Sequence, residues 1–266
     1  MESISIQEGP LRLLCFFSFI IIFMIYEFIF PFYKRTEKTF LRWITNFLFI
    51  IFDTLILRLS FPILAAGMAS ICADRGFGLL NNLSLSFWPS LIIAIILLDL
   101  GIWVQHFVFH RYNIFWRFHK IHHSDEEVDF STGIRFHPIE IIVSIFFKFS
   151  FIFIIGPSVL MVIIFEVILN GSSIFNHSNI YIPRSFELLV RKIIVTPSMH
   201  RIHHSMSPRE TNSNYGFNFS FWDRLFNTYC HESVEKEKDL KLGLEEFSKL
   251  EKKGFIKLML IPFFNK

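Results

Sequence analysis

The sequence predicts an all-α integral membrane protein of about four transmembrane helices, including a helical hairpin, with a histidine-rich helical cap. Three observations support this prediction. Of the 266 residues, 52% are hydrophobic and 36 are phenylalanine. Apolar runs approach the roughly 20 residues that a helix needs to cross a bilayer. Eight of the eleven histidines fall in three short windows with the spacing of helical neighbours.

Four apolar runs define the predicted spans. Residues 13–33, 43–72 and 87–109 are each long enough to cross a membrane, and residues 13–33 lack the basic start and the cleavage site of a signal peptide. The run at 139–174 is too long for one crossing, and Gly156-Pro157-Ser158 interrupts it. We therefore expect a hairpin there, with Pro138 in the first turn of its leading helix.

Charge predicts the orientation. The loop at 34–42 holds four basic residues, whereas the Gly/Asn/Ser-rich loop at 73–86 is weakly charged. The positive-inside rule then places 34–42 and the histidines on the cytosolic face, with the N-terminus and 73–86 outside. We expect N-terminal transmembrane helices at 1–86, a catalytic domain at 87–230, and a charged tail with an amphipathic end at 231–266.

Composition excludes other classes of protein. The formal charge of +3 is modest and no basic tract is present, so we expect no nucleic acid partner. Three widely spaced cysteines, Cys15, Cys72 and Cys230, predict neither a disulfide framework nor a cysteine zinc site.

The three histidine windows have the spacing of metal ligands on helices. H-x-x-x-H places two imidazoles on one helical face, and H-x-x-H-H, which occurs twice, adds a third beside such a pair. Eight imidazoles exceed the roughly four to six ligands of one transition metal, which predicts a di-metal centre. Imidazole suits Fe, Zn, Cu and Ni, so the ligands alone do not identify the metal. The predicted ligands are His106, His110, His119, His122, His123, His200, His203 and His204.

Other polar residues are candidates for the site. His177, after the hairpin, is a predicted ligand; His137 either binds metal or caps the hairpin helix; and His231, beside the charged tail, is not expected to bind. Asp99 lies within a span, on one helical face with His106 and about 10 Å from it along the axis. We expect a catalytic acid behind the ligands, so that Asp99→Asn keeps both metals and impairs turnover. A polar contact between helices is the alternative.

Five stretches resemble the fatty acid hydroxylase / sterol desaturase superfamily, and in particular its bacterial-type sterol desaturase proteins. The likeness covers about residues 95–230, in order and with matching spacings. It departs at N-T-Y (227–229), where the family often has G-T-Y. The stretches are Asp99 to Ser124, T-G-I-R-F-H-P-I-E (132–140), F-N-H-S-N-I (175–180), T-P-S-M-H-R-I-H-H-S (196–205) and N-Y-G-F-N-F-S-F-W-D-R-L-F-N-T-Y (214–229).

This resemblance implies an oxidoreductase, namely a membrane-bound non-haem di-iron oxygenase. Such an enzyme hydroxylates or desaturates an unactivated C–H bond of a lipid (sterol, fatty acyl or related) with O₂. It holds two iron ions, for which zinc can substitute in purified protein. Two electrons come from an external donor that is ferredoxin-, cytochrome b5- or reductase-like. The sequence agrees, because it has no Gly-rich dinucleotide motif and no cysteine set for an iron–sulfur cluster.

Two alternatives stay open at this point. One is a pterin-dependent ether-lipid (alkylglycerol) monooxygenase, which shares the histidine windows. The other is a non-catalytic membrane metal-binding protein. A metal carrier should place ionisable residues along a path through the bilayer, whereas this sequence gathers them at one face. That distribution favours an enzyme.

Overall fold

The computed structural model describes residues 2–35, 39–248 and 254–264, and within them the fold is helical without a β-strand. Residues 36–38 of the predicted 34–42 loop, and residues 249–253 and 265–266 of the predicted tail, lie outside the described residues. The predicted all-α class is confirmed.

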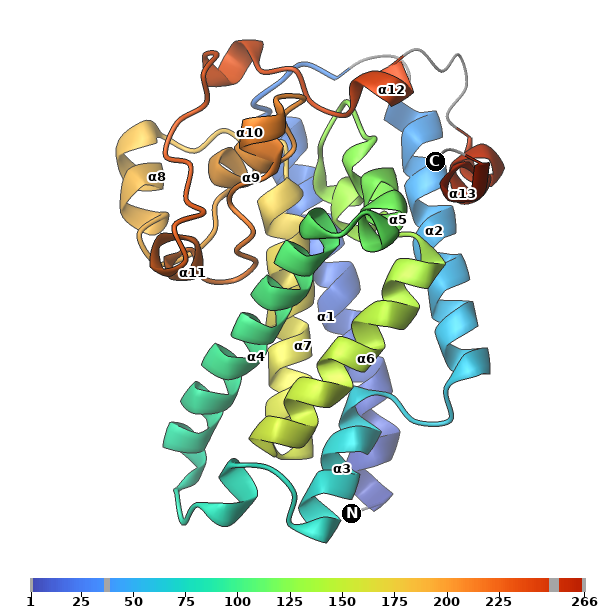
Figure 1. Ribbon diagram of the computed structural model, residues 1–266, viewed down its shortest axis with the longest axis vertical. Coiled ribbons are helices and arrows are strands. Elements are labelled where there is room, and N and C mark those ends of the chain that lie inside the picture. Colours follow the sequence, from blue (N-terminus) through green and yellow to red (C-terminus); the bar gives the residue numbers. More distant parts are fainter. Residues whose placement is uncertain (1, 36–38, 249–253, 265–266) are drawn as a thin grey trace.

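Long apolar helices form a tall bundle (Figure 1). Among the described residues, five segments are long and apolar enough to cross a membrane: Gly9–Ile29, Thr39–Asn82, Phe87–Arg111, Pro138–Ile155 and Val159–His177. They correspond to α1 (Glu2–Ile29), α2 (Thr39–Ser60) with α3 (Ala65–Arg75), α4 (Phe87–Arg111), α6 (Pro138–Ile155) and α7 (Val159–His177). On length and composition they make a multi-pass membrane protein.

The second predicted span is two helices. α2 ends at Ser60, and Pro62 follows, which cannot continue the backbone hydrogen bonds of a helix. α3 then lies at the lower end of the bundle (Figure 1). The long apolar run at 43–72 therefore enters the bundle as α2 and closes its lower end as α3.

The hairpin bends where its sequence predicts. α6 ends at Ile155, and Gly156 takes the left-handed conformation with φ 67°. Ser158 caps α7 by accepting a hydrogen bond from the Met161 backbone N–H. A side chain at Gly78 would place its Cβ 2.3 Å from the Gly156 nitrogen, so the two backbones touch. This contact fixes the bend against the loop that follows α3.

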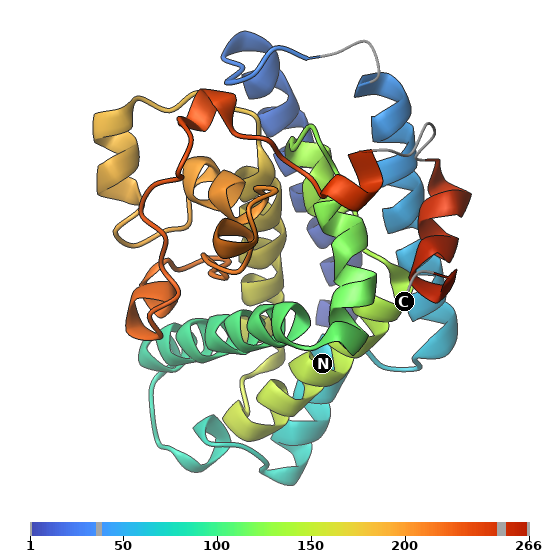
Figure 2. The same ribbon diagram turned by 45° about the horizontal axis from the view of Figure 1, so that its top comes forward.

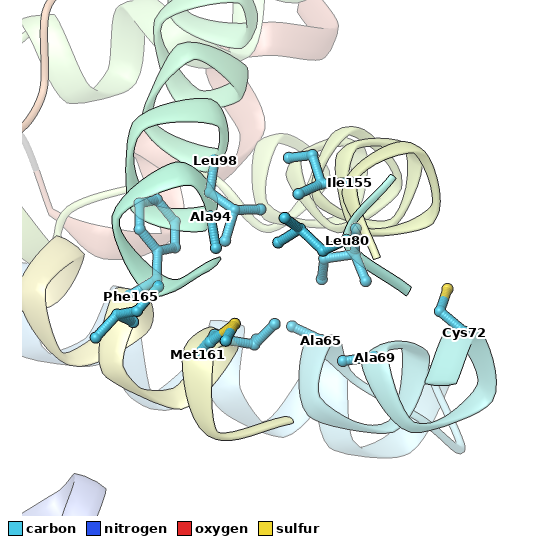
Figure 3. Packing of buried hydrophobic residues seen from close by; sticks show 12 residues of the cluster. Ala65, Ala69, Cys72, Leu80, Ala94, Leu98, Ile155, Met161 and Phe165 are labelled. Carbon is cyan, nitrogen blue, oxygen red and sulfur yellow. The ribbon is translucent and has the colours of Figure 1, made fainter. Parts of the chain in front are cut away.

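An apolar core lies at this end of the bundle (Figure 3). Ala65 and Ala69 of α3 and Ala94 of α4 are fully buried in one cluster with larger side chains such as Met161 and Phe165 of α7. The small residues allow the helices to approach closely, as is typical of membrane helix packing. The core thus sets the spacing of the helices whose opposite ends carry histidines.

The cap lies at the other end of the bundle (Figures 1 and 2). There the upper ends of α1 and α2 lie with all three histidine windows, while the N-terminal end of α1 and the segment 73–86 lie at the lower end. The cytosolic location of the cap remains a prediction. The cap contains α5 (Asn113–His123), α8 (Arg184–Val190), α9 (Pro197–His203), α10 (Pro208–Thr211), α11 (Phe221–Leu225), α12 (Glu245–Ser248) and α13 (Phe255–Phe264).

Ion pairs join the cap to the bundle. Arg42 of α2 contacts Asp125, at 2.9 Å, and Asp129. Arg135 donates to Asn46 of α2 at 3.1 Å. These contacts hold the segment 124–135, including the short helix η2 (Phe130–Ile134), against α2 and next to His122 and His177.

Candidate metal centre

The cap brings nine of the eleven histidines together in two adjacent groups. Within each group, one nitrogen of every ring lies within 4.8 Å of the others. The first group is His106, His110, His119, His123 and His203, and the second is His122, His177, His200 and His204. The eight window histidines and His177, all predicted as ligands, are therefore collected at one place.

Four helices supply these side chains. His106 and His110 come from the last turns of α4, and His177 ends α7. α5 carries the second window and α9 carries the third. Successive residues on a helix point about 100° apart. Each H-x-x-H-H window therefore divides its adjacent pair, with one imidazole entering each group.

Burial keeps the cap imidazoles neutral. It lowers the pKa of His119 from 6.5 to about 3, and the histidines around His123 and His203 reinforce a similar lowering of their pKa values. A histidine must be unprotonated to bind a metal ion. At neutral pH these rings are thus already in the ligand form.

Outer hydrogen bonds fix which nitrogen faces each group. Five Nδ1 atoms are bonded to oxygen atoms outside the groups, which leaves Nε2 facing inward, the arrangement common behind histidine metal ligands. The bonds run from His106 to the Tyr215 carbonyl (2.8 Å), His122 to the Arg135 carbonyl (3.2 Å), His177 to the Ser173 carbonyl (2.6 Å), His203 to the Ser213 carbonyl (2.7 Å) and His119 to Glu140 Oε1 (2.7 Å).

The inward nitrogens fit metal ions. Among the described residues, Nε2 of His106, His119 and His203 is buried without a hydrogen-bond partner. In the second group, His177 Nε2 lies 3.0 Å from His122 Nε2, although both rings use Nδ1 as the donor. Two acceptors that face each other repel, and a buried unpaired acceptor costs about 1–3 kcal/mol. A cation in each group removes both penalties, so an all-imidazole di-metal site suits these residues.

Two of the remaining candidates lie outside the groups. His137 accepts a hydrogen bond from the Ile139 backbone N–H at 3.2 Å, and its Nε2 lies 3.1 Å from the Met259 carbonyl. The sequence predicts that His137 either binds metal or caps the helix, and the bond to Ile139 makes it the N-cap of α6. The side chain of His231 is 57% exposed and also lies outside both groups.

Asp99 contacts the cap segment 214–222 and has no hydrogen bond to a histidine among the described residues. Its buried carboxylate accepts from the Asn218 backbone N–H (3.1 Å) and side-chain amide (2.8 Å), the Phe219 N–H (3.1 Å) and the Trp222 indole (3.0 Å). The Tyr215 carbonyl of this segment accepts a hydrogen bond from His106. Asp99 therefore acts on the metal centre indirectly, by holding the segment.

Sequence reasoning assigned no role to two further acids. Asp223 accepts from the backbone N–H groups of Tyr215 (2.8 Å) and Gly216 (2.7 Å) and from the Trp103 indole (3.0 Å), so it holds the same segment from the other side. Glu140 orients His119. Both acids lie in the motifs H-P-I-E and F-S-F-W-D, but their partners are distant in the sequence, so only three-dimensional contacts reveal their roles.

A cavity of about 370 Å³ lies in the bundle beside the centre, and most of its lining comes from α1, α2, α4, α6 and α7. Near the histidines its wall includes Gly133, Phe136 and Glu140. Phe136 stacks on His122, with ring centroids 4.7 Å apart. The volume lies within the roughly 300–1,000 Å³ that is usual for small-molecule sites.

Comparisons with known proteins agree with this geometry. The chain is 26% identical to ornithine lipid hydroxylase of Rhizobium tropici over 187 residues, which are 68% of this chain and 54% of that protein. It is 32% identical to alkylglycerol monooxygenase of Xenopus tropicalis over 147 residues, 53% of this chain and 30% of that protein. The chain thus spans about half or less of the length of these relatives. No solved structure matches it. Residues 91–228, more than half of the chain, match the model of the family described as fatty acid hydroxylase, and the protein belongs to that family.

Proposed function

We propose that the protein is a membrane-bound di-iron oxygenase that inserts oxygen into a C–H bond of a lipid. One observation carries the proposal: two buried imidazole groups lie at the end of membrane-length helices, beside a cavity that reaches into the bundle. The lipid named for one relative, an ornithine lipid hydroxylase, agrees with a lipid substrate.

Iron is the proposed occupant because the reaction requires a redox-active metal, whereas zinc has no redox chemistry. Two bound irons would supply the activation of O₂ and the transfer of one oxygen atom to carbon. The overall reaction converts R–H and O₂ to R–OH and water, and it consumes two electrons and two protons. An external ferredoxin-, cytochrome b5- or reductase-like donor supplies the electrons.

The residues of the chain have the remaining tasks. Glu140 holds the ring of His119, and Asp99 and Asp223 hold the segment 214–222, whose Tyr215 carbonyl orients His106. Phe136 separates the second group from the cavity and limits how closely a substrate chain approaches. The burial of the histidine groups excludes bulk water, which protects a reactive centre from side reactions.

Isotope incorporation tests the proposal. The purified, iron-loaded protein in nanodiscs of bacterial lipid would receive ¹⁸O₂ and a chemical reductant, followed by mass spectrometry of the extracted lipids. We expect a lipid that gains one ¹⁸O atom, with His231→Ala as an active control and His203→Ala inactive. Desaturation would appear as loss of two hydrogens without ¹⁸O. Unchanged lipids, with two irons bound, would refute the oxygenase.

Ether cleavage is the second candidate, favoured by the 32% identity to alkylglycerol monooxygenase. Hydroxylation of the carbon next to an ether oxygen gives a hemiacetal, which splits to an aldehyde and an alcohol. The same assay with an alkylglycerol, with and without a tetrahydropterin, separates the two. Aldehyde release that requires the pterin selects ether cleavage, and its absence leaves the first proposal.

Orientation requires its own test. We propose that the metal centre faces the cytosol. Single cysteines at the exposed positions Ser84, Glu126 and Arg209, in a background without Cys15, Cys72 and Cys230, would be labelled in intact cells with an impermeant reagent. Only position 84 should react from outside. Labelling of both positions 126 and 209 from outside, with position 84 unlabelled, would reverse the orientation without affecting the oxygenase proposal.

A further inference from the structure

The cavity beside the centre contains more charge than a fatty chain requires. Five ionisable side chains line it: Arg12, Lys148, Glu166, Asp53 and Glu140. Charged groups within membrane helices are costly and usually mark functional sites. Their presence in α1, α2, α6 and α7 differs from the expectation that the ionisable residues gather at one face. Their arrangement inside the cavity therefore bears on which part of a lipid the cavity accepts.

Three of these charges neutralise one another in part. Glu166 of α7 accepts from Arg12 of α1 at 2.5 Å and from Lys148 of α6 at 2.7 Å. Lys148 lies eight residues after Glu140, about 12 Å farther along α6 at 1.5 Å per residue. This cation pair thus has its own carboxylate and lies away from the histidines.

The other two acids have no cation. Asp53 is 6% exposed and Glu140 is 4% exposed. Among the described residues, Asp53 Oδ1 and Glu140 Oε2 are buried without a hydrogen-bond partner. Both carboxylates line the same cavity. A buried carboxylate without a partner is unfavourable unless it takes up a proton or binds a positive group.

A third unpaired acceptor lines the same cavity. Gln105 donates from its amide nitrogen to Ser144 Oγ at 2.8 Å, and Ser144 in turn donates to the Glu140 carbonyl at 2.8 Å. Since the Ser144 hydroxyl is committed as a donor, it must accept from Gln105, which leaves Gln105 Oε1 unpaired. All three unpaired atoms that line this end of the cavity are acceptors.

We propose that this end of the cavity binds the ammonium group of an aminolipid, with Asp53 as the counter-ion and Gln105 Oε1 and Glu140 Oε2 as further acceptors. An ammonium group has three donors, which match these three acceptors, whereas a hydroxyl has one. Asp53 and Glu140 line the cavity with buried oxygens that have no hydrogen-bond partner among the described residues, so a donor group at this end would satisfy both.

This inference rests on the proposed oxygenase and names its class of substrate. Glu140 also holds His119, so an ammonium group at Glu140 lies next to the first histidine group. The C–H bonds nearest the nitrogen would then be closest to the metal site, and the apolar wall formed by residues such as Ile145 and Leu169 would contact the chain.

Binding of three lipids with the same chain tests the inference. Tritiated hexadecylamine, hexadecanol and hexadecanoate would be titrated onto the metal-loaded protein in nanodiscs at pH 7, without O₂ or reductant. Wild type and variants are compared in the same nanodiscs, so partition into the bilayer cancels. We expect Asp53→Asn to weaken hexadecylamine binding at least tenfold and to change hexadecanol binding less than twofold.

Control variants keep the result interpretable. Asp53→Glu retains the charge and should retain most amine binding, and Asp74→Asn, exposed at the opposite end of the bundle, should change nothing. Metal content and circular dichroism identify a misfolded Asp53→Asn protein, in which case Gln105→Leu, with one acceptor removed, should still weaken amine binding.

Two results would overturn the aminolipid site. One is amine binding that Asp53→Asn leaves unchanged, as expected if Asp53 and Glu140 instead share a proton. The other is preferential binding of hexadecanoate that Arg12→Gln abolishes, which would assign recognition to the cation pair. Amine binding without ¹⁸O incorporation would refute the oxygenase alone, and ¹⁸O incorporation without selective amine binding would refute the aminolipid site alone.

Discussion

Replacement of Asp99 by asparagine tests whether the metal site depends on the hydrogen bonds that hold the segment 214–222. The Asp99 carboxylate accepts four hydrogen bonds, two at each oxygen, all from Asn218, Phe219 and Trp222. Asparagine is nearly isosteric but has one oxygen, and its NH₂ group would face two donors. The variant therefore loses two hydrogen bonds and gains a donor–donor conflict, while the bundle around α4 keeps its volume.

The size of the effect follows from these contacts. Hydrogen bonds to a charged group contribute about 1.5–3 kcal/mol each, so two are worth about 3–6 kcal/mol. Because the variant no longer has to bury a charge, part of this loss is offset, and we expect a net destabilisation of about 2–4 kcal/mol. The segment 214–222 would loosen, and with it the Tyr215 carbonyl that holds His106. Loss of such a support lowers metal affinity about 10–100-fold.

Metal retention measures this effect. The protein with two irons would be dialysed against increasing concentrations of chelator, and the bound iron would be counted by mass spectrometry. The unfolding temperature would be measured in parallel. Without chelator we expect Asp99→Asn to keep both irons, as predicted from the sequence. Because the bond to Tyr215 reaches only the first group, the variant should pass through a state with one iron at chelator concentrations where wild type keeps two. Asp74→Asn serves as the control. If Asp99→Asn retained both irons at those chelator concentrations and kept the wild-type unfolding temperature, the segment would not depend on Asp99.

Three further predictions concern the centre. His203→Ala and His122→Ala should each lower metal content by about one ion per chain, because the two rings belong to different groups, while His231→Ala should leave it at two; equal loss of both ions in either variant would contradict separate groups. Gly133→Ala should destabilise the protein by about 1–3 kcal/mol in thermal unfolding, because the new Cβ would lie 2.6 Å from the carbonyl oxygen that His177 bonds. Metal-free protein should lose stability as pH falls below 6.5, because burial lowers the pKa of His119 to about 3 and only the unfolded state takes up the proton. Between pH 7.5 and 5.5 each such histidine lowers the free energy of unfolding by about 1.4 kcal/mol. A free energy of unfolding that does not change with pH would show that the rings are solvated.

Local sequence patterns predict the parts of this fold that local physics determines. The hairpin bend requires a glycine with positive φ and a capping serine, and both are visible in Gly156-Pro157-Ser158. The histidine windows predict their helices because their spacing matches the helical repeat. Because all three windows and His177 are expected to share metals, the sequence also predicts that they lie together, as they do in the structure.

Long-range contacts explain what the sequence does not predict. An acid on the same helical face as two histidines is expected to act toward them, yet Asp99 contacts a segment that lies about 120 residues later. His137 has two plausible roles, and the choice depends on the Met259 carbonyl of α13, 122 residues away. The unpaired oxygens of Asp53 and Glu140 share a cavity only once α2 and α6 pack together.

Each H-x-x-H-H window supplies ligands to both histidine groups. The helices that carry these windows should therefore depend on bound metal for their ordered positions in the cap. α5 and α9 each supply ligands to both groups, whereas α4 and α7 each supply one group. α9 has seven residues, too few for a stable isolated helix, and metal binding at paired sites contributes directly to folding. Chelation should therefore raise hydrogen exchange at 197–204 and 113–123 at least tenfold, while 159–170 of α7 stays protected by the lower core. Restoring iron should reverse the change, and unaltered exchange in the cap after complete metal removal would show that side-chain packing alone holds these two helices in place.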